Sequence, residues 1–267
     1  MPAAKGSTKK AAARKPAKTP PPRMTVAETM RELKKAGSAQ ARKTYARHGA
    51  AGPMFGVSFA TLKALTKAID VDHELALALW DTGNFDARNL AVKIVDPARM
   101  TSDNLDRWAR ETSAARMCGG YVGMLAAEGP LGAKKAAQWL ASNDGRHRSA
   151  GWVLLGQLAQ RDETTPDALF EKRLVEIERT IHAAPNSERE GMNMAVIAIG
   201  CRSPGLRKAA IAAAKRTGKV EVDHGDTACK TPDAAESIEK AWAYAKSKGF
   251  ESPAAQERSR ETPRRRC

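Results

Sequence analysis

The sequence predicts an all-α protein whose helices pair and stack into a superhelical solenoid. The period-two alternation that marks strands is almost absent, and Ala and Leu fill most apolar positions. Apolar residues instead recur at helical spacing in about thirteen short segments with brief joints between them. A pattern of arginine followed three residues later by a small residue also recurs, beginning at Arg88, Arg148 and Arg207.

Local signals place the boundaries of these helices. Ser58 is a favoured N-cap residue at the start of one segment, and Pro97 ends another. Pro166, Pro204 and Pro232 lie at or near helix starts, where the fixed φ of proline fits best. The predicted helices cover residues 25–36, 39–48, 58–69, 72–81, 85–95, 102–111, 113–127, 133–142, 146–160, 166–183, 187–200, 204–217 and 232–248.

Repetition along the chain indicates the type of solenoid. The arginine pattern returns after 60 and then 59 residues, about one and a half repeats of the length found in HEAT arrays. Each such repeat is a helix pair that buries its apolar face only against its neighbours, so the pairs stack and curve. We therefore predict a HEAT-like helical repeat solenoid whose concave face offers a groove for an extended ligand.

Charge and composition divide the chain into three parts, with a net charge of +15 over 267 residues. Residues 1–23 are rich in Lys, Ala and Pro, carry seven basic and no acidic residues, and are expected to be disordered. Residues 249–267 carry five Arg and three Glu, a net +2, and are also expected to be disordered. Residues 24–248 carry the remaining +6 and form the predicted repeat domain.

The basic balance favours an anionic partner. A basic body with a basic arm is most often found in nucleic-acid-binding proteins, and less often at anionic membrane surfaces. Lys5, Lys9 and Lys10 of the arm are expected to add sequence-independent affinity for DNA by releasing counterions from phosphates. The alternatives are a tail that serves only solubility or targeting, and a body surface that is merely solvated.

Other classes of site find little support in the sequence. Cys118, Cys201, Cys229 and Cys267 form no CxxC pair, so we expect neither a metal site nor a disulfide framework. Glycine motifs that bind phosphates or dinucleotides are absent, and we expect no cofactor. There is no secretory signal and no apolar run near the ~18 residues that cross a bilayer. We expect a monomer in the reducing cytoplasm, associated with the nucleoid.

Three segments of the predicted repeat domain stand in a recognisable order and spacing. They read GPMFGVSFATLKALTKAI (residues 52–69), ALWDTGNFDARNLAVKIVD (residues 78–96) and QWLASNDGRHRSAGWVLL (residues 138–155). Together they resemble the AlkD-type DNA alkylation repair family of HEAT-like repeat DNA glycosylases, of which this chain would be a divergent member. The resemblance spans roughly residues 40–216.

The resemblance implies that a concave, basic face binds duplex DNA through its backbone. An arginine of this family that approaches the DNA backbone matches Arg148, which is the first candidate DNA-binding residue. Arg148 could equally tie one helix pair to its neighbour through an acid such as Asp144. Arg88, Arg116 and Arg47 are further candidates for phosphate contact. Arg116 could instead be merely solvated, and Arg47 could offset the dipole at a helix end.

The resemblance also implies base excision, but the catalytic residues of the family have no counterparts in this chain. In that family an aspartate and two tryptophans flank the exposed nucleotide and stabilise the positive charge that develops as the glycosidic bond breaks. The corresponding residues 113–127 contain no carboxylate, and residues 188–200 contain no tryptophan. Trp108 and Trp152 are either replacement stacking platforms or ordinary packing residues.

Three functions therefore stay open, and the catalytic residues stay unknown. The chain is a glycosylase that releases cationic alkylated purines, a non-catalytic binder of damaged, bent or branched DNA, or a helical-repeat scaffold for an acidic protein.

A second polar cluster comprises Asp223, His224, Asp226 and Cys229. These side chains are chemically able to bind a metal or to transfer protons, although their spacing matches no metal motif. The alternative is a turn whose polar side chains cap the helix that begins at Pro232.

Overall fold

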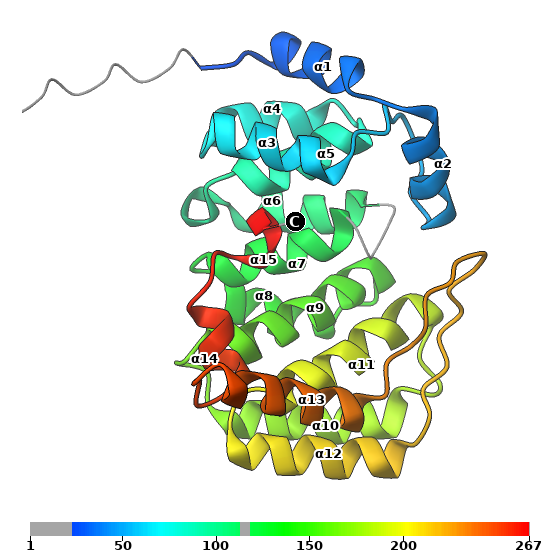
Figure 1. Ribbon diagram of the computed structural model, residues 1–267, viewed down its shortest axis with the longest axis vertical. Coiled ribbons are helices and arrows are strands. Elements are labelled where there is room, and N and C mark those ends of the chain that lie inside the picture. The colour runs from blue at the N-terminus through cyan, green and yellow to red at the C-terminus, as the bar shows by residue number, and fades with distance from the viewer. Residues whose placement is uncertain (1–22, 113–117, 267) are drawn as a thin grey trace, which may run out of the picture.

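The computed structural model describes residues 23–112 and 118–266, and within them all regular structure is helical apart from one isolated bridge between Gly37 and Val57. The helices stack into a curved array (Figure 1). They are α1 (Val26–Lys35), α2 (Ala39–Arg47), α3 (Phe59–Ile69), α4 (His73–Asp81), α5 (Phe85–Ile94), the 3-10 helix η1 (Pro97–Arg99), α6 (Ser102–Glu111), α7 (Cys118–Glu128), α8 (Gly132–Leu140), α9 (Gly145–Arg161), α10 (Asp167–Thr180), α11 (Asn186–Gly200), α12 (Pro204–Thr217), α13 (Ala234–Ser247), α14 (Pro253–Arg258) and α15 (Pro263–Arg266). None of these helices is long and apolar enough to cross a membrane.

Side-chain caps begin most of these helices, as the sequence predicts. The hydroxyl of Ser58 accepts a hydrogen bond from the backbone N–H of Thr61, which confirms it as the N-cap of α3. Thr25 forms a capping box with Glu28 at the start of α1. Helix α13 is capped by the carboxylate of Asp233. Each cap satisfies a backbone donor that has no partner inside its own helix.

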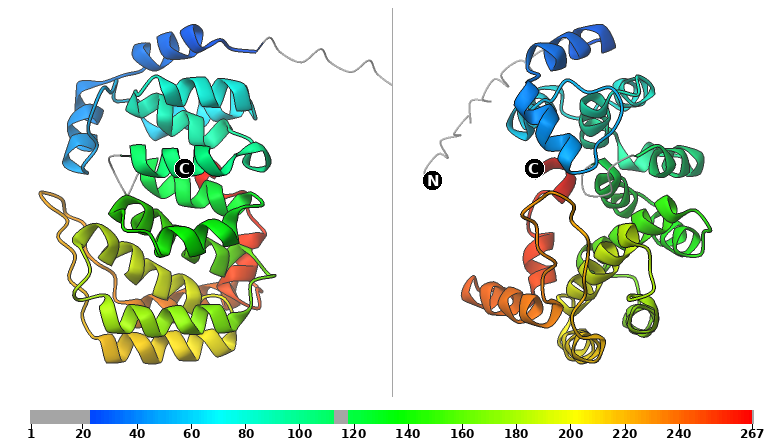
Figure 2. Two further views of the ribbon diagram at one scale, coloured as in Figure 1. Left: turned by 180° about the vertical axis from the view of Figure 1, so that it is seen from behind. Right: turned by 90° about the vertical axis from the view of Figure 1, so that its right-hand side faces the viewer.

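Two rows of helices make up the array. Helices α5, α7, α9 and α11 contact one another in turn and form an inner row, and α8, α10 and α12 pack outside it (Figure 2). Glycines allow the inner helices to approach closely. A Cβ on Gly123 of α7 would lie 2.8 Å from the carbonyl oxygen of Ala150 on α9. A Cβ on Gly191 of α11 would lie 3.0 Å from the Cβ of Trp152. The predicted all-α, HEAT-like superhelix is thus confirmed.

Buried tryptophans link successive repeats in the outer part of the array. The rings of Trp80 and Trp108 stack with centroids 4.0 Å apart, and both side chains are fully buried. Trp108 is therefore a packing residue rather than an exposed stacking platform. In the next repeat, Asp106 accepts hydrogen bonds from Nζ of the buried Lys135 (2.7 Å) and from Nε1 of Trp139 (2.6 Å).

The segment after α13 is folded, so the predicted disorder of residues 249–267 is wrong for its described part. Helices α13, α14 and α15 run back along the array, in orange and red in Figure 1. We call residues 234–266 the C-terminal strap. It lies against the C-terminal ends of α11, α9, α7, α5 and α3 in turn. The predicted arm at residues 1–23 lies outside the described residues except for Arg23.

The arginines of the strap explain why it folds. Arg264 is 2% exposed, and its guanidinium donates to the carbonyls of Val92 and Lys93 in the last turn of α5. It also bonds Glu128 at the end of α7, at 2.8 Å. Arg258 donates to the carbonyl of Gln160 in the last turn of α9. The final carbonyls of a helix lack intrahelical donors and carry partial negative charge, so these cations stabilise the helix ends.

Arg264→Met is expected to destabilise the fold by about 3 kcal/mol, because it leaves the largely buried Glu128, whose side chain is 13% exposed, and two helix-end carbonyls without their donor. Chemical denaturation followed by circular dichroism measures this. Arg260→Met is the matched control, since this strap arginine is exposed and should change stability by less than about 0.5 kcal/mol. Equal effects of the two substitutions would contradict the role assigned to Arg264.

Asp106 gives stability a predictable pH dependence. Burial alone raises the pKa of Asp106, but hydrogen bonds from Lys135 and Trp139 and the charge of Lys135 outweigh it, so the pKa lies below its ordinary value. A carboxyl with a depressed folded pKa contributes stability above its unfolded pKa of about 3.9, and that stability is lost as the pH falls through the folded value. Asp106→Asn should flatten the fall in melting temperature below about pH 4, whereas Asn at the exposed Asp103 should leave it unchanged.

Candidate nucleic-acid interface

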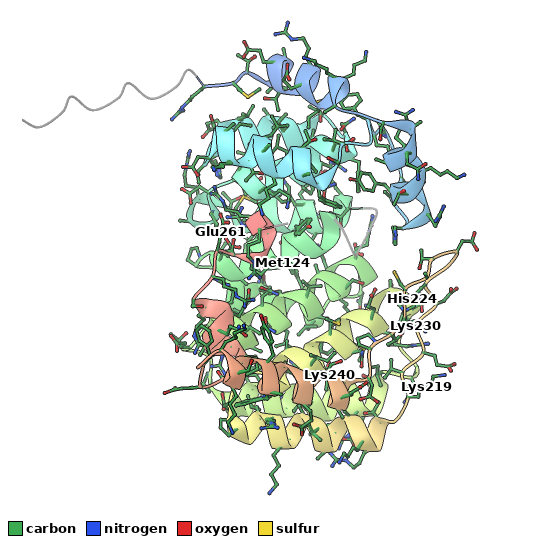
Figure 3. The ribbon with its side chains drawn as sticks, in the orientation of Figure 1. Met124, Lys219, His224, Lys230, Lys240 and Glu261 are labelled. Atoms are coloured by element: carbon green, nitrogen blue, oxygen red, sulfur yellow. The ribbon has the colours of Figure 1, made fainter. Side chains whose placement is uncertain are left out.

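A groove of about 930 Å³ lies on the inner row of helices. Residues of α7, α9 and α11 form its floor, among them Tyr121, Met124 and Trp152. Helix α2 borders it on one side, and the loop between α12 and α13 on the other (Figure 1). We call residues 218–233 the long loop. Figure 3 labels Met124 on α7, and His224 and Lys230 on the long loop.

A buried carboxylate holds the chain that positions α2. Asp86, fully buried in α5, accepts hydrogen bonds from the backbone N–H groups of Phe55 (2.6 Å), Gly56 (3.0 Å) and Val57 (2.7 Å). The hydroxyl of Tyr45 on α2 donates to the carbonyl of Val57 at 2.5 Å. The segments GPMFGVS and NFDARNL, separate in the sequence, thus form one unit that sets α2 at the edge of the groove.

Side chains of α11 hold the long loop in place through hydrogen bonds to its backbone. The side-chain amide of Asn186 donates to the carbonyl of Asp223 and accepts from its N–H, each at 2.8 Å. The guanidinium of Arg189 donates to the carbonyl of Glu221 at 2.8 Å. His224 and Thr231 share a hydrogen bond across the loop at 3.0 Å. These bonds fix a segment without helix or strand beside the groove.

Arg148 ties two inner helices together. Its guanidinium contacts both carboxylate oxygens of Glu188 on α11, at distances from 2.7 to 3.0 Å, and donates to the carbonyl of Ser142. The Glu188 side chain is only 6% exposed and that of Arg148 is 29% exposed. The hydrogen bonds that Arg148 donates to the Glu188 carboxylate raise the pKa of Arg148. The partner of Arg148 is Glu188 and not Asp144, whose carboxylate instead caps the start of α9.

Arg88 is also engaged inside the molecule. Its guanidinium lies 5.0 Å from the centre of the Trp80 ring, donates to the Trp80 carbonyl and bonds the carboxylate of Glu111 at 3.0 Å. Arg207, the third arginine of the repeated pattern, pairs with Glu239 of α13. All three arginines therefore join one helix to an acid further along the chain.

The other predicted DNA-binding residues are placed differently. Arg47 is exposed in the last turn of α2, beside the groove residue His48. Arg116, Lys5, Lys9 and Lys10 lie outside the described residues.

The polar cluster of the long loop does not converge on one point. Asp223 and Thr227 stabilise the turn, because the Asp223 carboxylate accepts from the N–H of Gly225 and the Thr227 hydroxyl donates to the carbonyl of His224. Asp226 and Cys229 are exposed. No three His, Cys, Asp or Glu side chains of the described residues are close enough to hold a metal ion. These side chains do not cap α13, whose cap is Asp233.

Residues 113–117, which begin the segment where the family's aspartate and first tryptophan are expected, lie outside the described residues, so the structure locates in full only the segment expected to carry the second tryptophan. Of the segment that replaces the second tryptophan, Met192 and Asn193 are buried, and Met194 is 48% exposed and lines the groove. Trp152 also lines the groove but is only 4% exposed. Glu190 is the one carboxylate residue among the described groove residues. The sequence alone does not single out Glu190, because nothing in its spacing tells it apart from Glu188, two residues earlier, which is the partner of Arg148.

The comparisons with known proteins agree with the fold and the motifs. A family model described as DNA alkylation repair enzyme matches residues 29–238. The chain belongs to the DNA alkylation repair family. Its last 29 residues, which include α14 and α15, lie beyond the matched region.

Relatives and a solved structure extend this assignment. A protein of Listeria innocua is 30% identical over 74% of this chain and 89% of its own length, and a protein of Listeria monocytogenes is 29% identical over the same shares. A solved structure is 30% identical and superposes with a TM-score of 0.74, covering 85% of this chain and 95% of its own. That protein is described as one of a new family related to the HEAT-like repeat DNA glycosylases, with affinity for branched DNA structures.

Arg148→Met is expected to destabilise the fold by about 2 kcal/mol, because it leaves the buried Glu188 without its partner. Replacing both residues by methionine should restore part of this loss, since it removes the unpaired charge as well. Thermal and urea unfolding of the two variants measures the difference. An unchanged stability of Arg148→Met would show that the guanidinium is free to serve a ligand.

Proposed function

We propose that this protein binds branched or bent DNA without cleaving a glycosidic bond. One observation carries the proposal: the chain shares 30% identity and its fold with a protein described as having affinity for branched DNA structures. The sequence supports it as well, because residues 113–127 and 188–200, where the family's catalytic aspartate and tryptophans are expected, contain neither residue type. The proposed ligand is the duplex DNA that forms the arms of a branched structure. The protein is proposed to bind it as a monomer, in association with the nucleoid.

The groove suits such a ligand better than it suits catalysis. Its floor is mostly apolar and its described residues include only Glu190 and Lys230 as fully charged types, so it offers contact area rather than a dense set of reactive groups. The seven cations of residues 1–23 add affinity for any phosphate backbone nearby. Sequence-independent backbone contacts are compatible with recognition of DNA by its shape.

A glycosylase is the second candidate, favoured by Glu190. Cleavage of a cationic alkylpurine needs a carboxylate near the developing positive charge and an electron-rich ring to face it. Glu190 from α11 and Tyr121 from α7 both line the groove and offer these two groups. The leaving purine already carries a positive charge, so little acid catalysis is required.

A binding and cleavage experiment separates these functions. Fluorescence anisotropy with a labelled four-way junction and a linear duplex of equal length is expected to give tighter binding of the junction, weakening as salt rises. Incubation with methylated DNA is expected to release no methylpurine. Release that is lost in Glu190→Gln would replace the proposal with the glycosylase. The absence of any DNA binding at about 50 mM salt would reject both and leave the protein scaffold.

A further inference from the structure

The excess positive charge of the folded chain is concentrated in its first three helices. Residues 24–69, which span α1, α2 and α3, contain eight Lys and Arg and two Glu, a net charge of +6. Residues 70–248 contain 25 basic and 25 acidic residues and are neutral overall. The long-range attraction of this array for a polyanion therefore originates at its N-terminal end.

Two of these helices carry cations spaced by four residues. Lys43 and Arg47 are such a pair on α2, and Lys63 and Lys67 are such a pair on α3. All four side chains are exposed, and within the described residues none of them forms an ion pair. Like charges at this spacing repel and weaken a helix, and a row of phosphates relieves that repulsion.

The α2 pair stands at the edge of the groove. Thr44 and His48 line the groove, and each directly follows one member of the pair, Lys43 or Arg47. Consecutive side chains of a helix point about 100° apart, so the pair lies on the exposed face of α2 next to the face that lines the groove.

The α3 pair extends the same edge. Phe59 in the first turn of α3 lines the groove, and Lys63 and Lys67 continue its face one and two turns further on. The rings of Phe59 and Tyr45 meet edge to face with centroids 5.7 Å apart, which joins α2 to the start of α3. The two cation pairs are thus connected through this contact and through the segment around Val57 that Asp86 and Tyr45 hold.

The arginines of the repeated pattern are not available to bind the phosphates of a ligand. Arg88 and Arg148 are bound to acids inside the array, and the groove itself contributes Lys230 as its only Lys or Arg among the described residues. We propose that Lys43, Arg47, Lys63 and Lys67 hold the phosphates of a duplex arm that runs along α2 and α3 at the edge of the groove. This site rests on the proposed DNA-binding function and assigns its affinity to residues outside the arginine pattern.

Two double variants test the site in the full-length protein. Lys43→Gln with Arg47→Gln, and Lys63→Gln with Lys67→Gln, are each expected to lower the slope of log affinity against log salt by about 2, with a loss of about 50-fold in junction affinity at about 0.1 M salt. The melting temperature should stay the same or rise, because each variant removes a like-charge repulsion. A loss of affinity without a loss of stability is the signature of a ligand contact.

Lys208→Gln with Lys215→Gln is the matched control. It removes two exposed lysines from α12, at the opposite end of the array, and should change neither the affinity nor the salt slope. If the α2 and α3 variants keep the wild-type slope, or if the α12 variant weakens binding as much as they do, the assigned site is wrong while the proposed function stands. If the wild-type protein binds no DNA, the proposed function itself fails.

Discussion

Arginine–carboxylate pairs between helices are the interaction on which the rest of this structure depends. The pairs are Arg88 with Glu111, Arg148 with Glu188, and Arg207 with Glu239. Each guanidinium stands at the same place in the repeated pattern and reaches an acid that lies further along the chain. Glu111 is half-buried and Glu188 is buried, so Arg88 and Arg148 are not free for a phosphate, because leaving these carboxylates unpaired costs stability. Internal pairing thereby decides which cations remain for a partner.

A second constraint comes from the parallel stacking of the inner helices. Helices α5, α7, α9 and α11 all end on the side where the strap lies, so their partial negative charges fall in one row. Such ends are stable when donors and cations meet them. The strap provides Arg258 and Arg264 there, and Trp242 donates from its Nε1 to the carbonyl of Gly200 at 2.7 Å. The opposite ends of α7 and α11 carry partial positive charge and adjoin the groove.

The local structure was predictable from the sequence because it depends on residue spacing. Helical periodicity, N-cap residues such as Ser58 and the glycines of tight helix contacts are all local signals. The folding of residues 249–266 was not predictable, because an arginine-rich tail lacks apolar content and its stability comes from carbonyls such as that of Val92, 172 positions away from Arg264. The partner of Arg148 was missed for the same reason, since Asp144 is near in sequence and Glu188 is near only in the fold.

The site shows a further limit of motif reasoning. The arginine pattern drew attention because it repeats, but repetition in a solenoid marks what each repeat needs for stacking. Residues that bind a ligand do not have to be repeated, because the ligand contacts the array at one place only. The cations of α2 and α3 fit this second description, because they lie outside the repeated arginine pattern and are exposed. They also flank the segment that is held by three hydrogen bonds to Asp86. In this chain the repeated arginines join neighbouring helices of the superhelix. The exposed cations of its N-terminal end are the ones that attract an anionic ligand.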